Sequence, residues 1–242
     1  MLILAIDTSG QSGGITLVEA DAESFRVIES AAIAGGTFSA QLIPTLAALL
    51  KKHGYGVKDL GGFAAASGPG SFTGLRVGLS AIKGLAETLQ KPIAVVSVLE
   101  ALASLSEHSG RVAAAMDAGR KEVFLGVFDK VGDNPEYRPV AEGRQSSAQG
   151  LQKEREELLS QQEFLAALSD EGAVWLITAD TAIAELAAES DSAVTVVARP
   201  GSEVVARLGA AKLLAGETVS VEALDANYLR RSDAEIFFKG NR

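Results

Sequence analysis

Two short apolar segments, each ending in an aspartate, constrain the fold of this chain most. Residues 3–7 read Ile-Leu-Ala-Ile-Asp and residues 113–117 read Ala-Ala-Ala-Met-Asp, and in both cases small residues and a second apolar segment follow. Short uninterrupted apolar segments are typical of strands buried on both faces. We therefore expect two halves of related topology, each with an aspartate-ended hairpin. Chance agreement between two buried hairpins is the alternative explanation.

Strand-like and helix-like segments alternate along much of the chain. We expect helices near residues 39–52, 71–89, 97–105, 152–168, 181–189 and 202–214, with short apolar strands between most of them. This alternation favours an α/β fold with much of its sheet parallel. The predicted division is an amino-terminal lobe at 1–107, a carboxyl-terminal lobe at 108–225 and a tail at 226–242.

The overall composition excludes several classes of function. The 242 residues carry a formal net charge of −9, so this chain alone is not expected to bind nucleic acid, which requires a basic surface. Cysteine is absent, which excludes disulfides, thiolate zinc sites and cysteine nucleophiles. The sequence has neither a signal-peptide pattern nor an apolar segment of membrane-spanning length. We expect a cytoplasmic protein that makes no membrane contact.

Two polar turns are candidates for binding phosphate. The stretch Gly68-Pro-Gly-Ser-Phe-Thr-Gly74 links a predicted strand to a helix, where free N–H groups and the helix dipole favour an anion. Ser71 and Thr73 could equally cap that helix, and the residue types do not separate the two interpretations. Asp7, Thr8 and Ser9 could meet phosphate or its magnesium, although an Asx turn is the commoner reason for such a sequence.

The helix predicted at 71–89 carries two stripes. Leu75, Leu79 and Ile82 form an apolar packing stripe, and Gly74 and Gly78 lie on a second stripe of small residues. Because a glycine inside a helix costs about 1 kcal/mol relative to alanine, the second stripe implies a close neighbour. That neighbour could be an internal element or another chain.

The sequence offers no evident catalytic group. Its two histidines, His53 and His108, belong to no metal-binding pair, and no Walker A lysine follows the glycine-rich turn. No nucleophile with a matched base is recognisable. These absences favour a binding protein over an enzyme, without a metal site of its own.

Several motifs together resemble the TsaB (YeaZ) family. They are Ile3–Ser9, Gly68-Pro-Gly-Ser-Phe-Thr-Gly-Leu-Arg-Val-Gly78, Lys83–Ala86, Pro92–Ser97 and Tyr228-Leu-Arg230. The family consists of bacterial proteins required for the N6-threonylcarbamoyl modification of adenosine 37 in tRNA, and it is related to the glycoprotease-like TsaD proteins. The resemblance implies an actin-like/Hsp70-like ATPase (ASKHA) fold of two RNase H-like lobes.

The resemblance also implies a noncatalytic role. TsaB proteins pair with the catalytic subunit TsaD, recruit the ATPase TsaE, form homodimers when alone and meet tRNA only through the complex. No intrinsic cofactor is implied, and ATP or ADP with magnesium would be expected only in the complex. The implied partner interface lies on the first two helices, at Leu42, Leu46, Leu49, Gly74, Leu75, Gly78, Leu79 and Ile82.

Nucleotide or phosphate contacts are expected at Asp7, Thr8, Ser9, Gly70, Ser71, Thr73 and Asp117, yet three features depart from the family pattern. Phe38 stands where many relatives have histidine. The turn Asp117-Ala-Gly-Arg120 displaces its arginine by one residue, and Thr178-Ala-Asp-Thr181 replaces a glycine-rich turn. We therefore expect weak nucleotide binding by this chain alone. The alternative function is a small-molecule kinase of the same fold, with Asp7 and Asp117 around Mg-ATP.

Overall fold

A computed structural model describes residues 1–131, 150–170, 174–190, 192–227 and 229, and it contains two five-stranded mixed sheets. The first sheet is built from the amino-terminal part of the chain. Its strands are β1 (Leu2–Asp7), β2 (Ser12–Ala20), β3 (Phe25–Ala34), β4 (Gly62–Gly68) and β5 (Ile93–Ser97). The helices among them are α1 (Phe38–Lys52), η1 (Val57–Asp59), α2 (Phe72–Leu89) and α3 (Val98–Ser104).

The second sheet follows in the chain. Its strands are β6 (Gly110–Gly119), β7 (Glu122–Lys130), β8 (Leu151–Ser160), β9 (Trp175–Thr178) and β10 (Ala193–Val196). The helices are α4 (Gln161–Asp170), α5 (Thr181–Ala187) and α6 (Ser202–Ala215). None of the helices in the described part of the chain combines the length and apolar character needed to cross a membrane.

The two sheets repeat one topology. The first has the order β3-β2-β1-β4-β5 and the second has the order β8-β7-β6-β9-β10 when read in the matching direction. In each, the first three strands form an antiparallel meander, the fourth strand pairs in parallel with the first, and the fifth pairs in parallel with the fourth. The predicted duplication is therefore confirmed, together with the α/β fold of two RNase H-like lobes. Asp7 is the last residue of β1, and Asp117 lies in the equivalent part of β6, directly before its irregular last residues.

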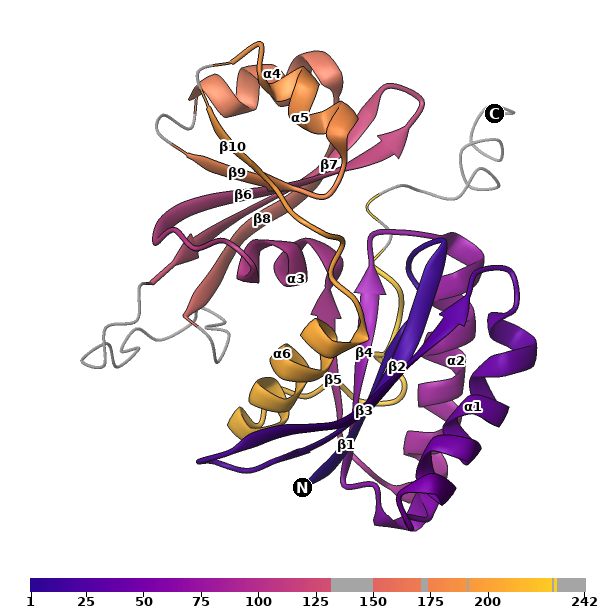
Figure 1. The fold of residues 1–242 in the computed structure, drawn as a ribbon. Helices are drawn as coiled ribbons and strands as arrows, with labels where there is room; N and C mark the ends of the chain where they lie inside the picture. Colours follow the sequence, from indigo (N-terminus) through magenta and orange to yellow (C-terminus); the bar gives the residue numbers. More distant parts are fainter. Residues whose placement is uncertain (132–149, 171–173, 191, 228, 230–242) are drawn as a thin grey trace.

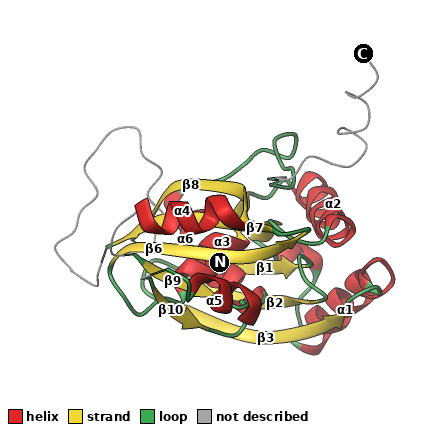
Figure 2. Cartoon of the chain, turned by 90° about the horizontal axis from the view of Figure 1, so that it is seen from above, coloured by secondary structure: helices red, strands yellow, loops and turns green. Residues whose placement is uncertain are grey.

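The helices form layers on both sides of each sheet. Helices α1 and α2 cover one face of the first sheet, and α4 and α5 cover the outer face of the second (Figures 1 and 2). Helix α3 contacts strands of both sheets, whereas α6 covers the other face of the first sheet and packs against α3. One apolar core runs through this central layer and joins the lobes.

Helix α6 belongs to a different lobe from the one predicted from the sequence. The prediction placed its residues in the carboxyl-terminal lobe, but α6 packs on β1, β2, β4 and β5 of the first sheet. Gly209 allows that contact, because a Cβ there would lie 2.3 Å from the Cβ of Ala64. The chain thus returns to its first lobe to cover an apolar face.

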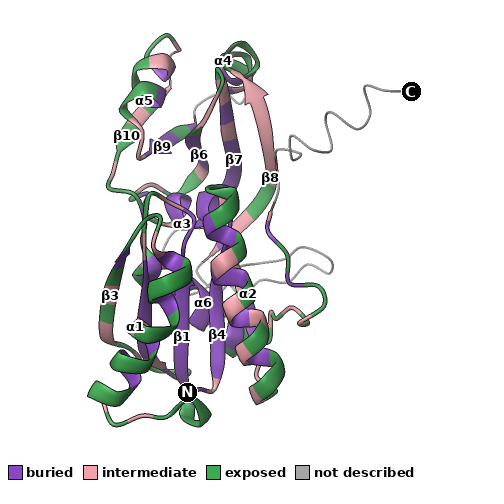
Figure 3. Cartoon of the chain, turned by 90° about the vertical axis from the view of Figure 1, so that its right-hand side faces the viewer, coloured by how far each residue is buried: buried purple, intermediate pink, exposed green. Residues whose placement is uncertain are grey.

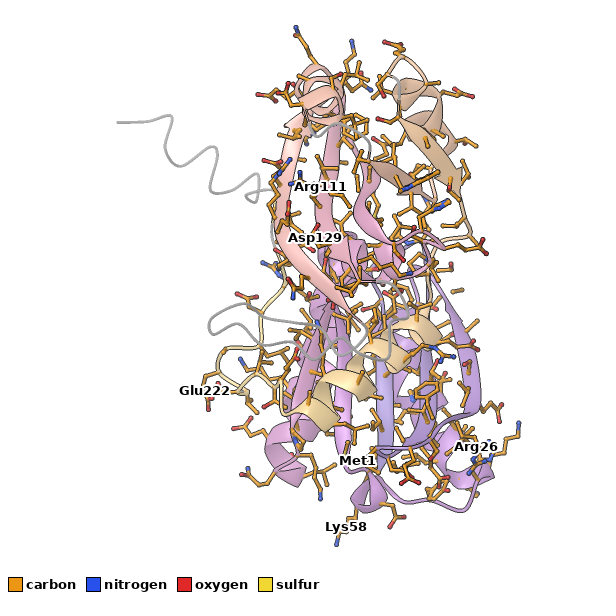
Figure 4. All side chains as sticks on the ribbon, turned by 90° about the vertical axis from the view of Figure 1, so that its left-hand side faces the viewer. Met1, Arg26, Lys58, Arg111, Asp129 and Glu222 are labelled. Atoms are coloured by element: carbon orange, nitrogen blue, oxygen red, sulfur yellow. The ribbon has the colours of Figure 1, made fainter. Side chains whose placement is uncertain are left out.

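The segment expected as one charged helix at 152–168 divides into a strand and a helix. Residues Leu151–Ser160 form β8 at the edge of the second sheet, and α4 follows. The charges of β8 suit an edge strand, since charged side chains discourage further strand pairing. Glu154 pairs with Arg111 of β6, whose register partner on β7 is Asp129 (Figure 4).

Candidate functional site

The candidate site is a cleft of about 1130 Å³ between the two lobes. It is lined by turns that follow strands β1, β4, β6 and β10 and by the first turns of α1 and α2. The carboxyl ends of strands in open α/β sheets are the usual position for ligands. Five of the seven residues predicted to contact phosphate lie on this lining, namely Ser9, Gly70, Ser71, Thr73 and Asp117.

Asp7 and Thr8 do not line the cleft. They are buried beneath it, and Asp7 Oδ1 accepts a hydrogen bond from the Ser9 N–H at 2.8 Å, as an Asx turn requires. The Thr8 hydroxyl donates to the Gly74 carbonyl at 2.7 Å. The Thr8 side chain joins the end of β1 to α2, and the Asp7 side chain shapes the turn after β1. Their predicted role as direct phosphate contacts is therefore corrected to a supporting role.

The first turn of α2 is capped by its own sequence. Ser71 Oγ accepts a hydrogen bond from the Gly74 N–H at 3.2 Å, and the Ser71 N–H donates to the Ser9 carbonyl at 2.7 Å. Gly70 permits this approach, since a Cβ there would lie 2.3 Å from the Ser9 carbonyl oxygen. The capping interpretation is therefore confirmed for Ser71, while Ser71 and Thr73 are both exposed on the cleft wall.

The second lobe contributes the hairpin between β6 and β7. Asp117 Oδ1 accepts a hydrogen bond from the Gly119 N–H, and the Asp117 N–H donates to Asp180 Oδ2, both at 2.8 Å. Arg120 and Lys121 have positive φ angles of 57° and 62°, as a two-residue hairpin turn demands. This turn brings Asp117 and Arg120 to the cleft.

Among the described residues, three arginines line the cleft, and the sequence analysis did not assign one of them to a site. Arg76 comes from α2, where its guanidinium lies 3.6 Å from the Phe72 ring centroid, and Arg120 comes from the second lobe. Arg199 follows β10, and its Nη2 donates to Ser9 Oγ at 3.4 Å. Its position after a strand and before a helix was the available signal.

Asp7 and Asp117, which lie in equivalent strands of the two lobes, are not arranged as a magnesium site. Asp7 is buried outside the cleft lining, and each carboxylate already accepts a backbone hydrogen bond through Oδ1. Within the described ranges, no group of three histidine or acidic side chains has a metal-binding arrangement. The donor set around this cleft therefore does not fit a magnesium–nucleotide complex.

The side chains predicted as a partner interface are part of the core. Residues Leu42, Leu46, Leu49, Leu75, Leu79 and Ile82 are all buried within this single chain, where α1 and α2 pack on the first sheet. The leucine stripe was read correctly as a packing face but assigned to the wrong neighbour. An apolar stripe has the same sequence pattern whether a sheet or another chain covers it.

The glycine stripe of α2 is also explained within the chain. A Cβ at Gly74 would lie 2.1 Å from the Thr8 carbonyl oxygen, and one at Gly78 would lie 2.4 Å from Thr8 Oγ1. The close neighbour that the glycines imply is therefore the end of β1. This corrects their predicted role at a subunit interface.

Figure 3 shows that one face of α1 is exposed to solvent, and the residues on this face are unusually apolar. Residues 38–50 contain no charged side chain, and Ile43 is 52% exposed beside exposed Ala40, Pro44, Ala47 and Ala48. Partly exposed Val77, Ala81 and Leu85 occupy the neighbouring helix α2. We call these eight residues the outer helical face. Solvent-facing helix surfaces normally carry charged or polar residues.

The sequence matches known proteins of tRNA modification. The family model described as "TsaD: tRNA N6-adenosine threonylcarbamoyltransferase" matches residues 31–236. The protein named "tRNA threonylcarbamoyladenosine biosynthesis protein TsaB" of Bacillus subtilis (strain 168) is 36% identical over 129 residues, which cover 53% of this chain and 55% of the relative. Its namesake from Escherichia coli (strain K12) is 30% identical over 138 residues, covering 54% and 56%. The chain spans about half the length of these curated relatives.

Two solved structures share the fold. The structure titled "YeaZ from Pseudomonas aeruginosa" has a TM-score of 0.68 and 23% identity, and covers 93% of this chain and 100% of its own. An uncharacterised protein described as similar to the peptidase YeaZ from Pseudomonas aeruginosa has a TM-score of 0.71 and 24% identity, with coverage of 95% and 99%. These similarities extend to both lobes of the chain.

Proposed function

Because the chain belongs to the TsaD-type family and to its TsaB (YeaZ) group, we propose that it acts in the formation of threonylcarbamoyladenosine in tRNA. Its proposed role is that of a noncatalytic subunit. It would pair with a TsaD-like catalytic protein and, through that complex, work with a TsaE-like ATPase. Contact with tRNA would come through the partners, in keeping with the net charge of −9.

The outer helical face is the observation that carries the proposed pairing. The core of a subunit interface is depleted in charged residues and enriched in apolar ones, which describes the surface around Ile43. Alanine and proline neighbours would allow a partner helix to come close. We propose that the same face pairs two copies of this chain when the TsaD-like partner is absent, which makes the two assemblies mutually exclusive.

The cleft supports a noncatalytic role for this chain. The kinase alternative expects Asp7 to bind the metal, but Asp7 is buried and accepts a hydrogen bond from the Ser9 N–H. Its counterpart Asp117 accepts a hydrogen bond from the Gly119 N–H. A kinase of this fold needs a magnesium-bound nucleotide and a base near the acceptor. Any Mg-ATP or Mg-ADP in the assembly would therefore need ligands from a partner.

The test compares two glutamate substitutions on exposed helix positions. Ile43→Glu places a charge in the outer helical face, whereas Leu214→Glu alters a 45% exposed leucine on α6. Both proteins should keep their circular dichroism spectrum and melting temperature. On size-exclusion chromatography with a TsaD-like protein, Ile43→Glu should lose the complex and Leu214→Glu should retain it. Loss of the complex with both variants, or with neither, would show that the interface lies elsewhere.

A further inference from the structure

Three of the four sheet edges in the described part of the chain carry features that discourage further strand pairing. The edge of β5 is covered by an antiparallel bridge between Ile93 and Val219. The edge strand β8 has five consecutive charged residues at 153–157, and β3 carries Arg26 and Glu29, which form ion pairs. Proteins use covers and charged side chains in this way because an open edge can pair with a strand of another chain.

The fourth edge, at β10, lacks these features. β10 is the end strand of the second sheet, and among the strands that the structure describes it pairs with β9 alone. Residues 193–198 read Ala-Val-Thr-Val-Val-Ala, without a charge, proline or glycine. Uncharged segments rich in β-branched residues pair readily as strands. Figure 3 shows β10 at the margin of the second lobe, where Thr195 is exposed and Val196 is 52% exposed.

Packing fixes the direction in which β10 presents its backbone. Val194 packs on the core beneath α4 and α5, and Val197 packs on the core that joins the lobes, so both faces of the strand are supported. The Val197 N–H donates to the Thr178 carbonyl of β9 at 2.9 Å. Because backbone groups alternate in direction along a strand, the N–H and C=O groups of Val194 and Val196 point away from β9. These groups form the free edge of β10.

From these features we propose that the free edge of β10 pairs with β10 of a second copy of this chain. In an antiparallel arrangement about a two-fold axis at Thr195, Val194 of each copy lies opposite Val196 of the other. Each Val–Val pair then exchanges both of its backbone hydrogen bonds, and the two Thr195 side chains lie opposite each other between the pairs. Cross-strand pairs of β-branched residues and of threonines stabilise such a ladder, and no like charges meet in it.

The sequence of β10 favours a second copy as the occupant, because the edge is complementary to itself under two-fold symmetry. One strand pair is much smaller than a standard subunit interface, so the pairing should be weak and dependent on protein concentration. β10 belongs to the second lobe, whereas the outer helical face lies on α1 and α2 of the first. The two surfaces are therefore independent, and either pairing can fail without the other.

Disulfide trapping tests the proposal, because the chain has no cysteine of its own. Thr195→Cys places one thiol from each copy in a non-hydrogen-bonded pair, whose Cα atoms lie about 4.5 Å apart and within reach of a disulfide. With oxidised glutathione, the Ile43→Glu, Thr195→Cys protein should form a covalent dimer on nonreducing gels. Ile43→Glu removes any contribution from the outer helical face. The control carries Val57→Cys in place of Thr195→Cys, at a valine of the first lobe that is 43% exposed, and should stay monomeric.

Two further variants separate strand pairing from random collision. Val196→Lys, added to the Thr195→Cys protein, puts a charge on the free edge and should slow dimer formation several-fold. Val196→Cys in place of Thr195→Cys should cross-link more slowly, since Val196 lies opposite Val194 and not opposite itself. All variants should keep the circular dichroism spectrum and melting temperature of the parent protein. Absence of a cross-link at Thr195, or equal cross-linking at Val57, Thr195 and Val196, would overturn the proposal.

Discussion

Gly78 and Gly84 lie on the same helix but in opposite surroundings. A Cβ on Gly78 would lie 2.4 Å from the buried Thr8 hydroxyl, whereas nothing lies within 4 Å of a Cβ on Gly84. The sequence alone shows two glycines with similar helix penalties. Only the position of β1 behind α2 determines which of them is required.

Gly78→Ala should destabilise the protein, and Gly84→Ala should stabilise it. The first forces Thr8 away from its hydrogen bond with Gly74 and should cost about 1–3 kcal/mol of unfolding free energy. The second removes conformational freedom from the unfolded chain and should add about 0.4–1 kcal/mol. Urea denaturation of both variants gives the two values. A stable Gly78→Ala protein would contradict the close packing of β1 and α2.

Residue roles were predictable where local chemistry decides them. The Asx turn at Asp7 and the cap at Ser71 follow from short-range hydrogen bonds that their sequence already favours. The position of Arg199 between a strand and a helix was a weak signal, but its contact with Ser9 joins residues far apart in the chain and could not be predicted. Tyr228 and Arg230 of the predicted tail lie outside the described residues.

At the scale of elements, α3 and α6 are linked by a partly buried ion pair. Lys212 Nζ donates to Glu100 Oε2 at 2.7 Å and to the Val95 carbonyl at 3.1 Å, and only 15% and 10% of the two side chains are exposed. Lys212 therefore joins the helix that returns to the first lobe with the helix between the sheets. Removing one partner of such a buried pair lowers the unfolding free energy more than replacing both partners with apolar residues does.

Lys212→Met should lower the unfolding free energy by about 3 kcal/mol, since Glu100 would keep a buried charge without its partner. The double variant Glu100→Gln, Lys212→Met should recover part of that loss. Arg26→Met is the control, because Arg26 pairs with Glu19 at an exposed position and should cost less than about 1 kcal/mol. Strictly additive single and double variants would show that the two helices are not coupled through this pair.

Most helices and strands could be predicted because their apolar periodicity is strong, but the segment at 152–168 could not. Segment 152–168 contains charges and leucines in an order that also fits a helix, so local pattern could not reveal the strand in its first part. Pairing with β7 decides the matter, since β8 gains a full ladder of backbone hydrogen bonds there. An edge strand also tolerates charged residues that an interior strand would exclude.

The whole molecule is two copies of one topology joined by a central layer and by the segment after α6. Near its end, the Asn227 N–H donates to the Ser67 carbonyl and its Nδ2 donates to Glu156 Oε2, both at 2.7 Å. Ser67 belongs to β4 of the first sheet and Glu156 to β8 of the second. Asn227 thus bridges the lobes while lining the cleft between them.

At this scale the duplication was visible in the sequence, but the surfaces were not. Two aspartate-ended hairpins were enough to predict related lobes. The face of α1 that is exposed to solvent depends on how the helix is oriented against the first sheet. The sequence alone does not give this orientation. The leucines face inward, and the uncharged outer helical face around Ile43 remains available to a partner.

The most direct test of the proposed function is reconstitution of the modification reaction. A TsaD-like protein, a TsaE-like ATPase, ATP, threonylcarbamoyl adenylate and unmodified tRNA would be combined, and threonylcarbamoyladenosine would be measured by mass spectrometry of digested tRNA. Adding this chain should restore modification, Leu214→Glu should match it, and Ile43→Glu should not. Modification that proceeds equally well without the chain would contradict its role as a required subunit.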